Sequence, residues 1–405
     1  MTLRTSSTSR SWQSELLSAV LLILGGIFFA LAVAEGILRL VPGLVSAELQ
    51  QIIERDPDNF GIPNQYIGYL GKPNFTYITA GKDFRAVSHT DGYGFRNAWP
   101  WPDRAEIVAV GDSLTNGYGV ENDQEWPAIL KKKLPGNRLV NLGLTGAGPQ
   151  QYFRLYETFG IKLHPKLLLV GFLVRNDFWD DQMFDLWLKS GSGGNYMVWR
   201  DFGRPKFTRF DPEQPIASLS SSLRWRVNLL ASKSRVYNLL HYSQGNIRGW
   251  LRAGSKNTES TRTFETPDGT PQELALRDYA NVTKHAQPGS RAFEISVEAL
   301  RRLHAIAGAN GTRALVVFQP SKEETYLPLM GITDYDSDPG RPLRVRLEKL
   351  GIPYVDLLPE FRSRAAKGEV LFFEIDGHPN ARGYALIAEL VLDHIKRNAK
   401  TYDLN

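Results

Sequence analysis

Residues 108–119, Val-Ala-Val-Gly-Asp-Ser-Leu-Thr-Asn-Gly-Tyr-Gly, are the stretch from which the fold can be worked out. A short apolar run ends at Gly111, presents Asp112 and Ser113, and continues into a polar segment spaced by glycines. This pattern is typical of a buried strand that turns tightly into a helix or loop. Ligands of open α/β sheets bind beyond the carboxyl ends of the strands, and Ser113 lies at such an end. Ser113 is therefore a candidate nucleophile, the alternative being a serine that only caps the turn.

The composition is that of a globular protein large enough to bury a substantial core. The chain has 405 residues, of which 42% are hydrophobic and 22% are charged. Its net charge of +5 is too small to indicate a nucleic-acid-binding protein, and we expect no nucleic-acid partner. The absence of cysteine excludes disulfides, thiolate metal sites and a cysteine nucleophile. We predict neither a metal nor a cofactor.

An apolar segment near the N-terminus predicts a membrane anchor, which we assign to 16–40. The 19 residues from Leu16 to Ala34 carry no charge, and a helix of that length rises about 28 Å, close to the hydrocarbon thickness of a bilayer. Two arginines precede it, so the positive-inside rule places a tail of residues 1–15 in the cytoplasm and the body of the protein in the periplasm or outside the cell. The alternatives are a cleaved signal peptide, because Ala32-Val33-Ala34 resembles a cleavage site, and a buried core helix.

Beyond the anchor, short apolar strands alternate with helical segments. Residues 41–103 form a lead-in of turns and short extended pieces, and 104–398 form the main domain. We predict five strands, at 106–110, 138–142, 166–172, 313–319 and 352–357, and helices at 125–134, 150–159, 290–309, 343–350 and 381–398. Strands separated by helices indicate an α/β fold with a parallel sheet covered on both faces.

Residues 178–289 interrupt this alternation as a large insert. They hold five of the nine tryptophans, and from Arg200 to Arg262 basic residues outnumber acidic ones by 12 to 4. The simplest interpretation is a satellite subdomain whose aromatic residues form its own core. Tryptophan faces also suit stacking on sugar rings, and the basic surplus suits an anionic partner. The patchy helical apolarity from Ser222 to Leu251 is compatible with a helix on a membrane surface.

Residues able to carry chemistry follow each predicted strand. Ser113 follows the first strand and Gly146 the second. Asn176 follows the third and Lys322 the fourth, and beyond the fifth comes Glu374-Ile375-Asp376-Gly377-His378. In a doubly wound sheet these loops meet at one edge, so we expect the residues to converge. Lys322 is a candidate for binding an anionic substrate group, or else a solvated loop lysine.

Four of these blocks resemble the conserved blocks of the SGNH (GDSL) hydrolase superfamily. They are Gly111-Asp112-Ser113-Leu114, a glycine after Asn141, Asn176-Asp177, and Asp376 with His378. The resemblance covers about 107–180 and 313–398, and it implies a flavodoxin-like, three-layer α/β/α sandwich with a five-stranded parallel sheet. The apolar anchor, with Glu35 and Leu38-Arg39-Leu40, is similar to membrane-anchored bacterial members of the family.

The resemblance implies a catalytic triad and an oxyanion hole. Ser113 would be the nucleophile, His378 the base that takes its proton, and Asp376 the acid that orients the imidazole. The donors to the oxyanion would be the backbone N–H groups of Ser113 and Gly146 and the side-chain amide of Asn176.

Two of these assignments have alternatives. Gly143 competes with Gly146, although the family's count from Asn141 favours Gly146. The family's acid usually lies three residues before the histidine, where this chain has Ile375. Asp376 lies two residues before the histidine and Glu374 four before it. We assign the role to Asp376.

Three further positions concern the shape of the loops rather than the reaction. Val174 replaces the glycine that usually opens the third block, so we expect a differently shaped loop there. Asp112 and Asp177 are expected to hold loops by accepting backbone N–H bonds instead of entering the reaction.

Together these features predict an extracytoplasmic serine esterase of the SGNH type that removes ester-linked acyl groups. The favoured substrate is an O-acylated cell-envelope glycan, with a lipid ester second. An O-acyltransferase acting on a polysaccharide would use the same acyl-serine chemistry. A non-catalytic glycan-binding or assembly protein is the alternative from another class.

Overall fold

The computed structural model describes most of the chain. The described residues are 12–45, 61–134, 138–191, 194–200, 233–240 and 261–404, with Leu49, Gly136, Val227, Leu230, Ala231 and Ser243. The predicted tail before residue 12 and most of the insert from 201 to 260, including Trp225 and Trp250, lie outside these residues.

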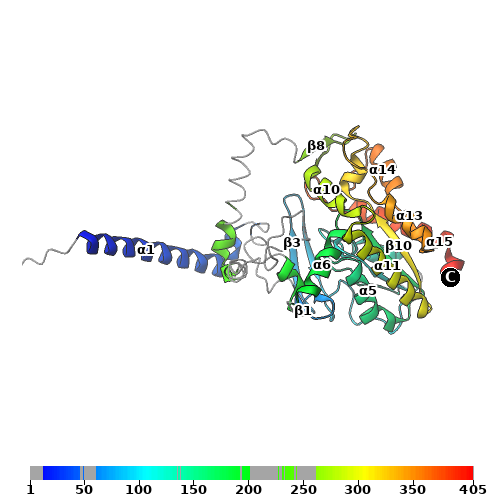
Figure 1. Cartoon of the computed structure of the whole chain (residues 1–405), viewed down its shortest axis with the longest axis horizontal. Coiled ribbons are helices and arrows are strands. Elements are labelled where there is room, and N and C mark those ends of the chain that lie inside the picture. The colour runs from blue at the N-terminus through cyan, green and yellow to red at the C-terminus, as the bar shows by residue number, and fades with distance from the viewer. Residues whose placement is uncertain are drawn as a thin grey trace, which may run out of the picture.

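A five-stranded parallel sheet forms the centre of the main domain (Figure 1). In spatial order its strands are β11 (Tyr354–Asp356), β10 (Arg313–Gln319), β7 (Leu167–Leu173), β5 (Ile107–Val110) and β6 (Leu139–Asn141). Every neighbouring pair runs parallel. The order is that of a flavodoxin-like, doubly wound sheet, and the predicted fold class is confirmed.

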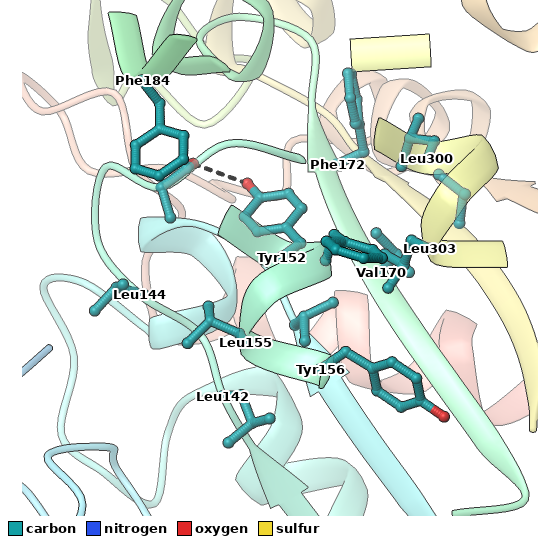
Figure 2. Close-up of a cluster of buried hydrophobic side chains, with 14 of the residues drawn as sticks. Leu142, Leu144, Tyr152, Leu155, Tyr156, Val170, Phe172, Phe184, Leu300 and Leu303 are labelled. Carbon is teal, nitrogen blue, oxygen red and sulfur yellow. Dashed lines mark hydrogen bonds between the residues drawn. The ribbon is translucent and has the colours of Figure 1, made fainter. Parts of the chain in front are cut away.

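One face of the sheet is covered by α5 (Pro149–Leu155), α6 (Asp177–Ser190) and α11 (Arg291–Ala309). Figure 2 shows part of this layer, in which Val170 and Phe172 of β7 lie among Tyr152 of α5 and the leucines of α11. Because successive strand residues point to opposite faces, the neighbours of Val170 and Phe172 in β7 belong to the other layer.

The opposite face is covered by α4 (Trp126–Lys133), α14 (Leu358–Ala366) and α15 (Ala381–Arg397). Leu167 and Leu169 of β7 are fully buried there. A π-helical turn (Tyr156–Gly160) and a 3₁₀ turn (Ile161–Leu163) follow α5. Other helices of the domain include α12 (Lys322–Tyr326), α13 (Arg341–Lys349) and α16 (Ala399–Tyr402).

Capping residues explain where the two long helices begin. The Ser290 hydroxyl accepts the backbone N–H of Phe293 at 3.2 Å and starts α11. Asn380 caps α15 by accepting two backbone N–H groups at 3.0 Å each. These side chains satisfy donors that have no partner inside the helix, which is why both starts were predicted within one residue.

The lead-in consists of two antiparallel hairpins that pack on the main domain. The first pairs β1 (Ile62–Asn64) with β2 (Gly68–Leu70), and the second pairs β3 (Thr76–Ala80) with β4 (Arg85–His89). Ile67, Tyr69 and Phe95 join the core under α5 and α6. The extended pieces predicted for this region are therefore strands.

The described parts of the insert extend the core of the main domain. α6 and the short α7 (Tyr196–Val198) pack on its first face, and β8 (Arg262–Glu265), β9 (Pro271–Leu274) and α10 (Leu276–Thr283) pack on its second. Trp187 and Trp199 are buried, and Trp179 packs against the same core. For these three tryptophans the core interpretation holds, rather than sugar stacking. A 3₁₀ turn (Lys284–Ala286) leads into α11.

The N-terminal helix α1 (Trp12–Leu40) extends away from the domain (Figure 1) and is followed by a 3₁₀ turn (Pro42–Leu44). Its stretch from Ser14 to Leu40 is long and apolar enough to cross a membrane, as a signal sequence also would be, and its most apolar window is fully exposed. The helix begins a few residues earlier than the predicted anchor.

Candidate active site

Ser113 is held at the carboxyl end of β5 by a turn that requires glycine. It begins the short helix α3 (Ser113–Asn116), which Asp112 caps by accepting the backbone N–H of Leu114 at 2.9 Å. A Cβ on Gly111 would lie 2.0 Å from Thr115 Oγ1. The turn thus leaves room for no side chain before Asp112, and Ser113 retains an exposed fraction of 7%.

His378 and Asp376 meet Ser113 from a loop beyond β11. His378 Nε2 lies 2.9 Å from Ser113 Oγ, and His378 Nδ1 lies 2.6 Å from Asp376 Oδ1. Asp376 Oδ1 also accepts the backbone N–H of His378 at 2.8 Å. Because Asp376 lies two residues before His378, this bond closes an Asx turn, and the turn brings the Asp376 carboxylate to the His378 ring.

The pKa of Asp376 supports an ionised carboxylate beside the imidazole. Burial on its own raises this pKa, but the charge and the hydrogen bonds of His378 outweigh burial and bring the pKa below its ordinary value. Arg175 adds to this effect. Glu374, the alternative acid, is exposed, and the partner of His378 Nδ1 is Asp376.

Lys322 is not the solvated loop lysine that was one expectation for it, because it is buried and bonded to backbone carbonyls. Its side chain is fully buried, and its Nζ donates to the backbone carbonyls of Phe373 at 2.7 Å and Glu374 at 2.8 Å. The carbonyl of Asp376 lies 3.5 Å away. Burial lowers the pKa of Lys322 from 10.5 to about 8. The ammonium therefore holds the loop that carries the acid and the histidine.

Other residues that sequence reasoning missed support the same loop. The carboxylate of Asp83, in the lead-in, accepts the backbone N–H of Ile375 at 2.6 Å and of Asp376 at 3.3 Å. The ring of Tyr118 lies 4.5 Å from the imidazole of His378, centroid to centroid. Asp83 and Ile375 are 292 residues apart, and no motif in the sequence connects them.

Arg96 is a further lead-in residue that bears on the serine loop. Its guanidinium donates to the carbonyls of Gly117 at 2.5 Å and Val120 at 2.8 Å, just after α3. It also pairs with Glu125 at 3.3 Å, and both side chains are 1% exposed. Arg96 belongs to the lead-in, for which turns and short extended pieces were predicted.

The structure separates the two glycines that compete for the oxyanion hole. The backbone N–H of Gly143 donates to Asn141 Oδ1 at 2.8 Å, so Gly143 is committed to holding its own loop. Gly146 has a positive φ of 74° at the turn beyond β6. The positive φ explains why this position is glycine, and the engagement of the Gly143 N–H leaves Gly146 as the proposed donor.

The amide of Asn176 is engaged on both of its N–H groups. Nδ2 donates to Asp112 Oδ2 at 3.1 Å and to Asp180 Oδ2 at 2.9 Å. A side-chain amide has only two such donors. In this state Asn176 therefore joins the serine loop to α6, and it turns neither N–H towards an incoming oxyanion.

Several buried carboxyl groups surround Asn176. Asp177 accepts the backbone N–H of Leu173 at 3.0 Å and the hydroxyl of Tyr152 at 3.0 Å. Burial and the neighbouring charge of Asp112 raise the pKa of Asp177 well above its ordinary range, and burial also raises that of Asp112. The two aspartates hold loops through backbone N–H groups, as the sequence suggested.

Two arginines reach this edge of the sheet without any motif to mark them. Arg200, in the insert, places Nη1 3.1 Å from Asp180 Oδ1 and 3.3 Å from the carbonyl oxygen of Gly146. Arg175 places Nε 3.2 Å from the buried carboxylate of Glu323. Val174, which replaces the usual glycine, is buried in the core beside it.

The arrangement needs no metal to activate a nucleophile. Among the residues that the structure describes, no group of three histidine, aspartate or glutamate side chains is placed to hold a metal ion. Serine, imidazole and carboxylate in hydrogen-bonded order are a combination that can take a proton from the hydroxyl and stabilise the imidazolium that results.

No family model and no curated protein matches the chain, whereas solved structures do. One is a member of the lipolytic protein G-D-S-L family from Veillonella parvula, with 13% identity, a TM-score of 0.36, and coverage of 72% of this chain and 99% of that one. A putative acylhydrolase from Bacteroides fragilis has 13% identity, a TM-score of 0.35, and coverage of 75% and 93%. A catalytic mutant of an acetylxylan esterase from Geobacillus stearothermophilus has 12% identity, a TM-score of 0.35, and coverage of 73% and 96%. These solved structures match about three quarters of this chain at 12–13% identity.

Proposed function

We propose that the protein is a serine esterase of the SGNH type that cleaves ester-linked acyl groups. The observation that carries this proposal is the array of Ser113 Oγ, His378 Nε2 and Nδ1, and Asp376 Oδ1, with successive distances of 2.9 and 2.6 Å. Each distance is that of a hydrogen bond. The proposed base is therefore within reach of the Ser113 proton, and the proposed acid is within reach of the base.

In the first half-reaction, Ser113 Oγ attacks the acyl carbonyl while His378 Nε2 takes the hydroxyl proton. The tetrahedral intermediate collapses when the protonated His378 gives that proton to the leaving alcohol oxygen, which leaves the acyl group on Ser113. In the second half-reaction, His378 takes a proton from water, the hydroxide attacks the acyl-serine, and the proton returns to Ser113 Oγ. Asp376 stays ionised throughout and stabilises the imidazolium.

The proposed donors to the oxyanion are the backbone N–H groups of Ser113 and Gly146 and the amide of Asn176. For Asn176 to serve, one of its two present hydrogen bonds must be exchanged for a bond to the substrate oxygen. The bond to Asp112 is the longer of the two, at 3.1 Å, and is the one we expect to be exchanged. Loss of one oxyanion donor typically raises the barrier by about 3–4 kcal/mol.

We propose further that α1 is a retained anchor and that the catalytic domain lies outside the cytoplasm. The length and apolarity of Ser14–Leu40 support an anchor, and the two arginines before it support the orientation. The favoured substrate is an O-acylated glycan of the cell envelope. This choice rests on the location proposed above and on the basic surplus of the insert sequence, which suits an anionic partner.

Covalent labelling tests the serine-enzyme proposal directly. A fluorophosphonate probe should label the wild type but not the Ser113→Ala variant, and an unlabelled wild type would favour the non-catalytic binding protein instead. Asp376→Asn should lower the esterase kcat by about 10⁴-fold, because the imidazole would be held in the wrong tautomer. The matched control, Glu374→Gln, changes an exposed carboxylate in the same loop and should leave kcat unchanged.

Two further measurements test the substrate and the topology. Acetate release from a panel of acylated glycans and lipid esters identifies the acyl donor. Acyl transfer to an added polysaccharide, in preference to water, would make the protein an acyltransferase. A reporter fused after Asn405 should be active outside the cytoplasm, and activity inside it would contradict the orientation.

A further inference from the structure

We propose that the membrane end of α1 and residues 233–240 of the insert form a clamp that holds this part of the insert on the bilayer surface. The partner that covers its apolar side chains is a membrane containing anionic lipids. The inference rests on the anchoring proposed above, but it concerns a surface remote from Ser113 and a different set of residues.

The first half of the clamp is a carboxylate at the start of a second helix. Residues 235–240 are helical, and the first backbone N–H groups of any helix have no partner within it. Glu35 of α1 accepts the backbone N–H groups of Arg235 at 3.1 Å and Val236 at 2.9 Å, and the hydroxyl of Ser234 at 2.9 Å. A negative charge at a helix N-terminus is also favoured by the helix dipole.

In the second half of the clamp, a side chain of the insert binds the end of α1. Arg235 Nη1 donates to the carbonyl of Leu38 at 2.5 Å, in the last turn of α1, where carbonyls lack partners within the helix. Arg39 bridges both segments, because Nε donates to Glu35 Oε1 at 2.7 Å and Nη2 donates to the carbonyl of Lys233 at 2.8 Å. Each segment thus satisfies polar groups that the other leaves open.

This position explains why an acidic residue is tolerated near the end of an apolar helix. A charged side chain within a membrane helix is costly unless it is paired or reaches the polar interface. Glu35 lies five residues before the end of α1 at Leu40. Its carboxylate is paired with Arg39 and also accepts a backbone N–H of the insert. The clamp therefore lies at the membrane surface when α1 spans the bilayer.

The surface beside the clamp suits lipid. Val227, Leu230 and Leu240 are 55%, 70% and 57% exposed, and in Figure 1 a green helical segment of the insert lies beside the end of α1. The surrounding sequence, from Arg200 to Arg262, carries 12 basic and 4 acidic residues. Apolar side chains next to a basic surplus are the combination that an anionic membrane surface attracts.

The cysteine-free chain makes a site-specific test straightforward. The full chain with Leu230→Cys is labelled with an environment-sensitive fluorophore and reconstituted into vesicles of phosphatidylcholine and phosphatidylglycerol that contain a spin-labelled lipid quencher. The label should be quenched, whereas a label at Val345→Cys, exposed on α13, should not be. Quenching should weaken in vesicles of phosphatidylcholine alone.

The clamp itself is tested by Glu35→Gln, with Glu15→Gln at the other end of α1 as the matched control. Removing the charge and one acceptor should lower the ratio of docked to undocked insert by about tenfold, equivalent to about 1.4 kcal/mol. Glu15→Gln should leave the quenching unchanged. Vesicles that float with the protein while the label at residue 230 stays unquenched would overturn the surface contact.

Quenching that is insensitive to Glu35→Gln would overturn the clamp. Failure of the chain to float with the vesicles is a separate result, since it would refute the anchoring and the bilayer contact together. Labelling of Ser113 by a fluorophosphonate is independent of all these outcomes.

Discussion

Lys322→Met removes the ammonium that holds the loop of Asp376 and His378, and it leaves an unbranched side chain in the same buried space. The two short bonds that disappear, to Phe373 and Glu374, join a charged donor to carbonyls. Bonds of this type contribute about 1.5–3 kcal/mol each, so the variant loses about 3–6 kcal/mol of local stabilisation.

An opposing contribution offsets about half of that loss or more. Burial lowers the pKa of Lys322 from 10.5 to about 8, and at about 1.36 kcal/mol per pKa unit the folded protein pays about 3 kcal/mol to keep the lysine charged at neutral pH. Methionine carries no such cost. We therefore expect the free energy of unfolding to fall by only about 0–3 kcal/mol near neutral pH.

Activity should respond more strongly than stability. A displacement of about 1 Å in a catalytic group costs on the order of 100-fold in rate, so kcat should fall by about that factor while KM changes little. The assay is hydrolysis of a chromogenic acetate ester, with urea unfolding measured in parallel. Lys349→Met, an exposed lysine of α13, is the matched control and should change neither quantity. A Lys322→Met variant with wild-type kcat would refute the positioning role.

The same substitution has a pH signature. Between about pH 8 and 10.5, the unfolded chain keeps the Lys322 proton that the folded chain has released. Stability rises with pH wherever the unfolded state binds more protons. The wild type should therefore gain up to about 3 kcal/mol relative to Lys322→Met across this range, and no such gain should be seen below pH 8.

Two other substitutions test residues that hold the segment after Ser113 and the turn at Gly146. Arg96→Ala removes the buried guanidinium that donates to the carbonyls of Gly117 and Val120. Hydrogen bonds to charged groups contribute about 1.5–3 kcal/mol each, so urea unfolding should show a loss of about 3–6 kcal/mol. A loss no greater than that of Arg301→Ala, in an exposed ion pair, would contradict this. Gly146→Ala would place a Cβ 2.6 Å from Arg200 Nη1, at a φ of 74°. A residue with a side chain costs about 1–2 kcal/mol in this left-handed conformation, so kcat/KM should fall by about tenfold or more. Adding Arg200→Ala should recover part of that rate, and strictly additive losses would exclude a clash between the two groups.

Much of the fold follows from patterns that act over a few residues. The apolar run of β7, the cap at Ser290 and the tight turn at Gly111 are local consequences of burial, unpaired N–H groups and missing space. The predicted strands and long helices therefore agree closely with the structure. Helix α6 was not predicted, because its residues were assigned to the irregular insert. The small helices α10, α12 and α14 were also missed, because their apolar faces are short and are defined by what packs against them.

The candidate site was predictable where a single stretch carries the chemistry. Ser113 follows a strand at a turn that admits only glycine before it, and His378 follows an aspartate at a spacing that an Asx turn closes. The burial of Lys322 was not predicted, because sequence shows where a residue falls along the chain but not whether another loop will cover it. Its ammonium is enclosed by carbonyls some 50 residues further along the chain.

The sequence by itself therefore determined where the strands lie along the chain, the apolar N-terminal helix and the candidate side chains for the reaction. Only the tertiary structure decided that the Gly143 N–H donates to Asn141 and that Glu35 accepts the N–H of Arg235. It also decided that Asp83 and Lys322 bind the loop that carries Asp376 and His378. The physical reason is the same in each case. A buried polar group must find a partner, and when that partner comes from a distant part of the chain, only the packing of the whole fold determines which one it is.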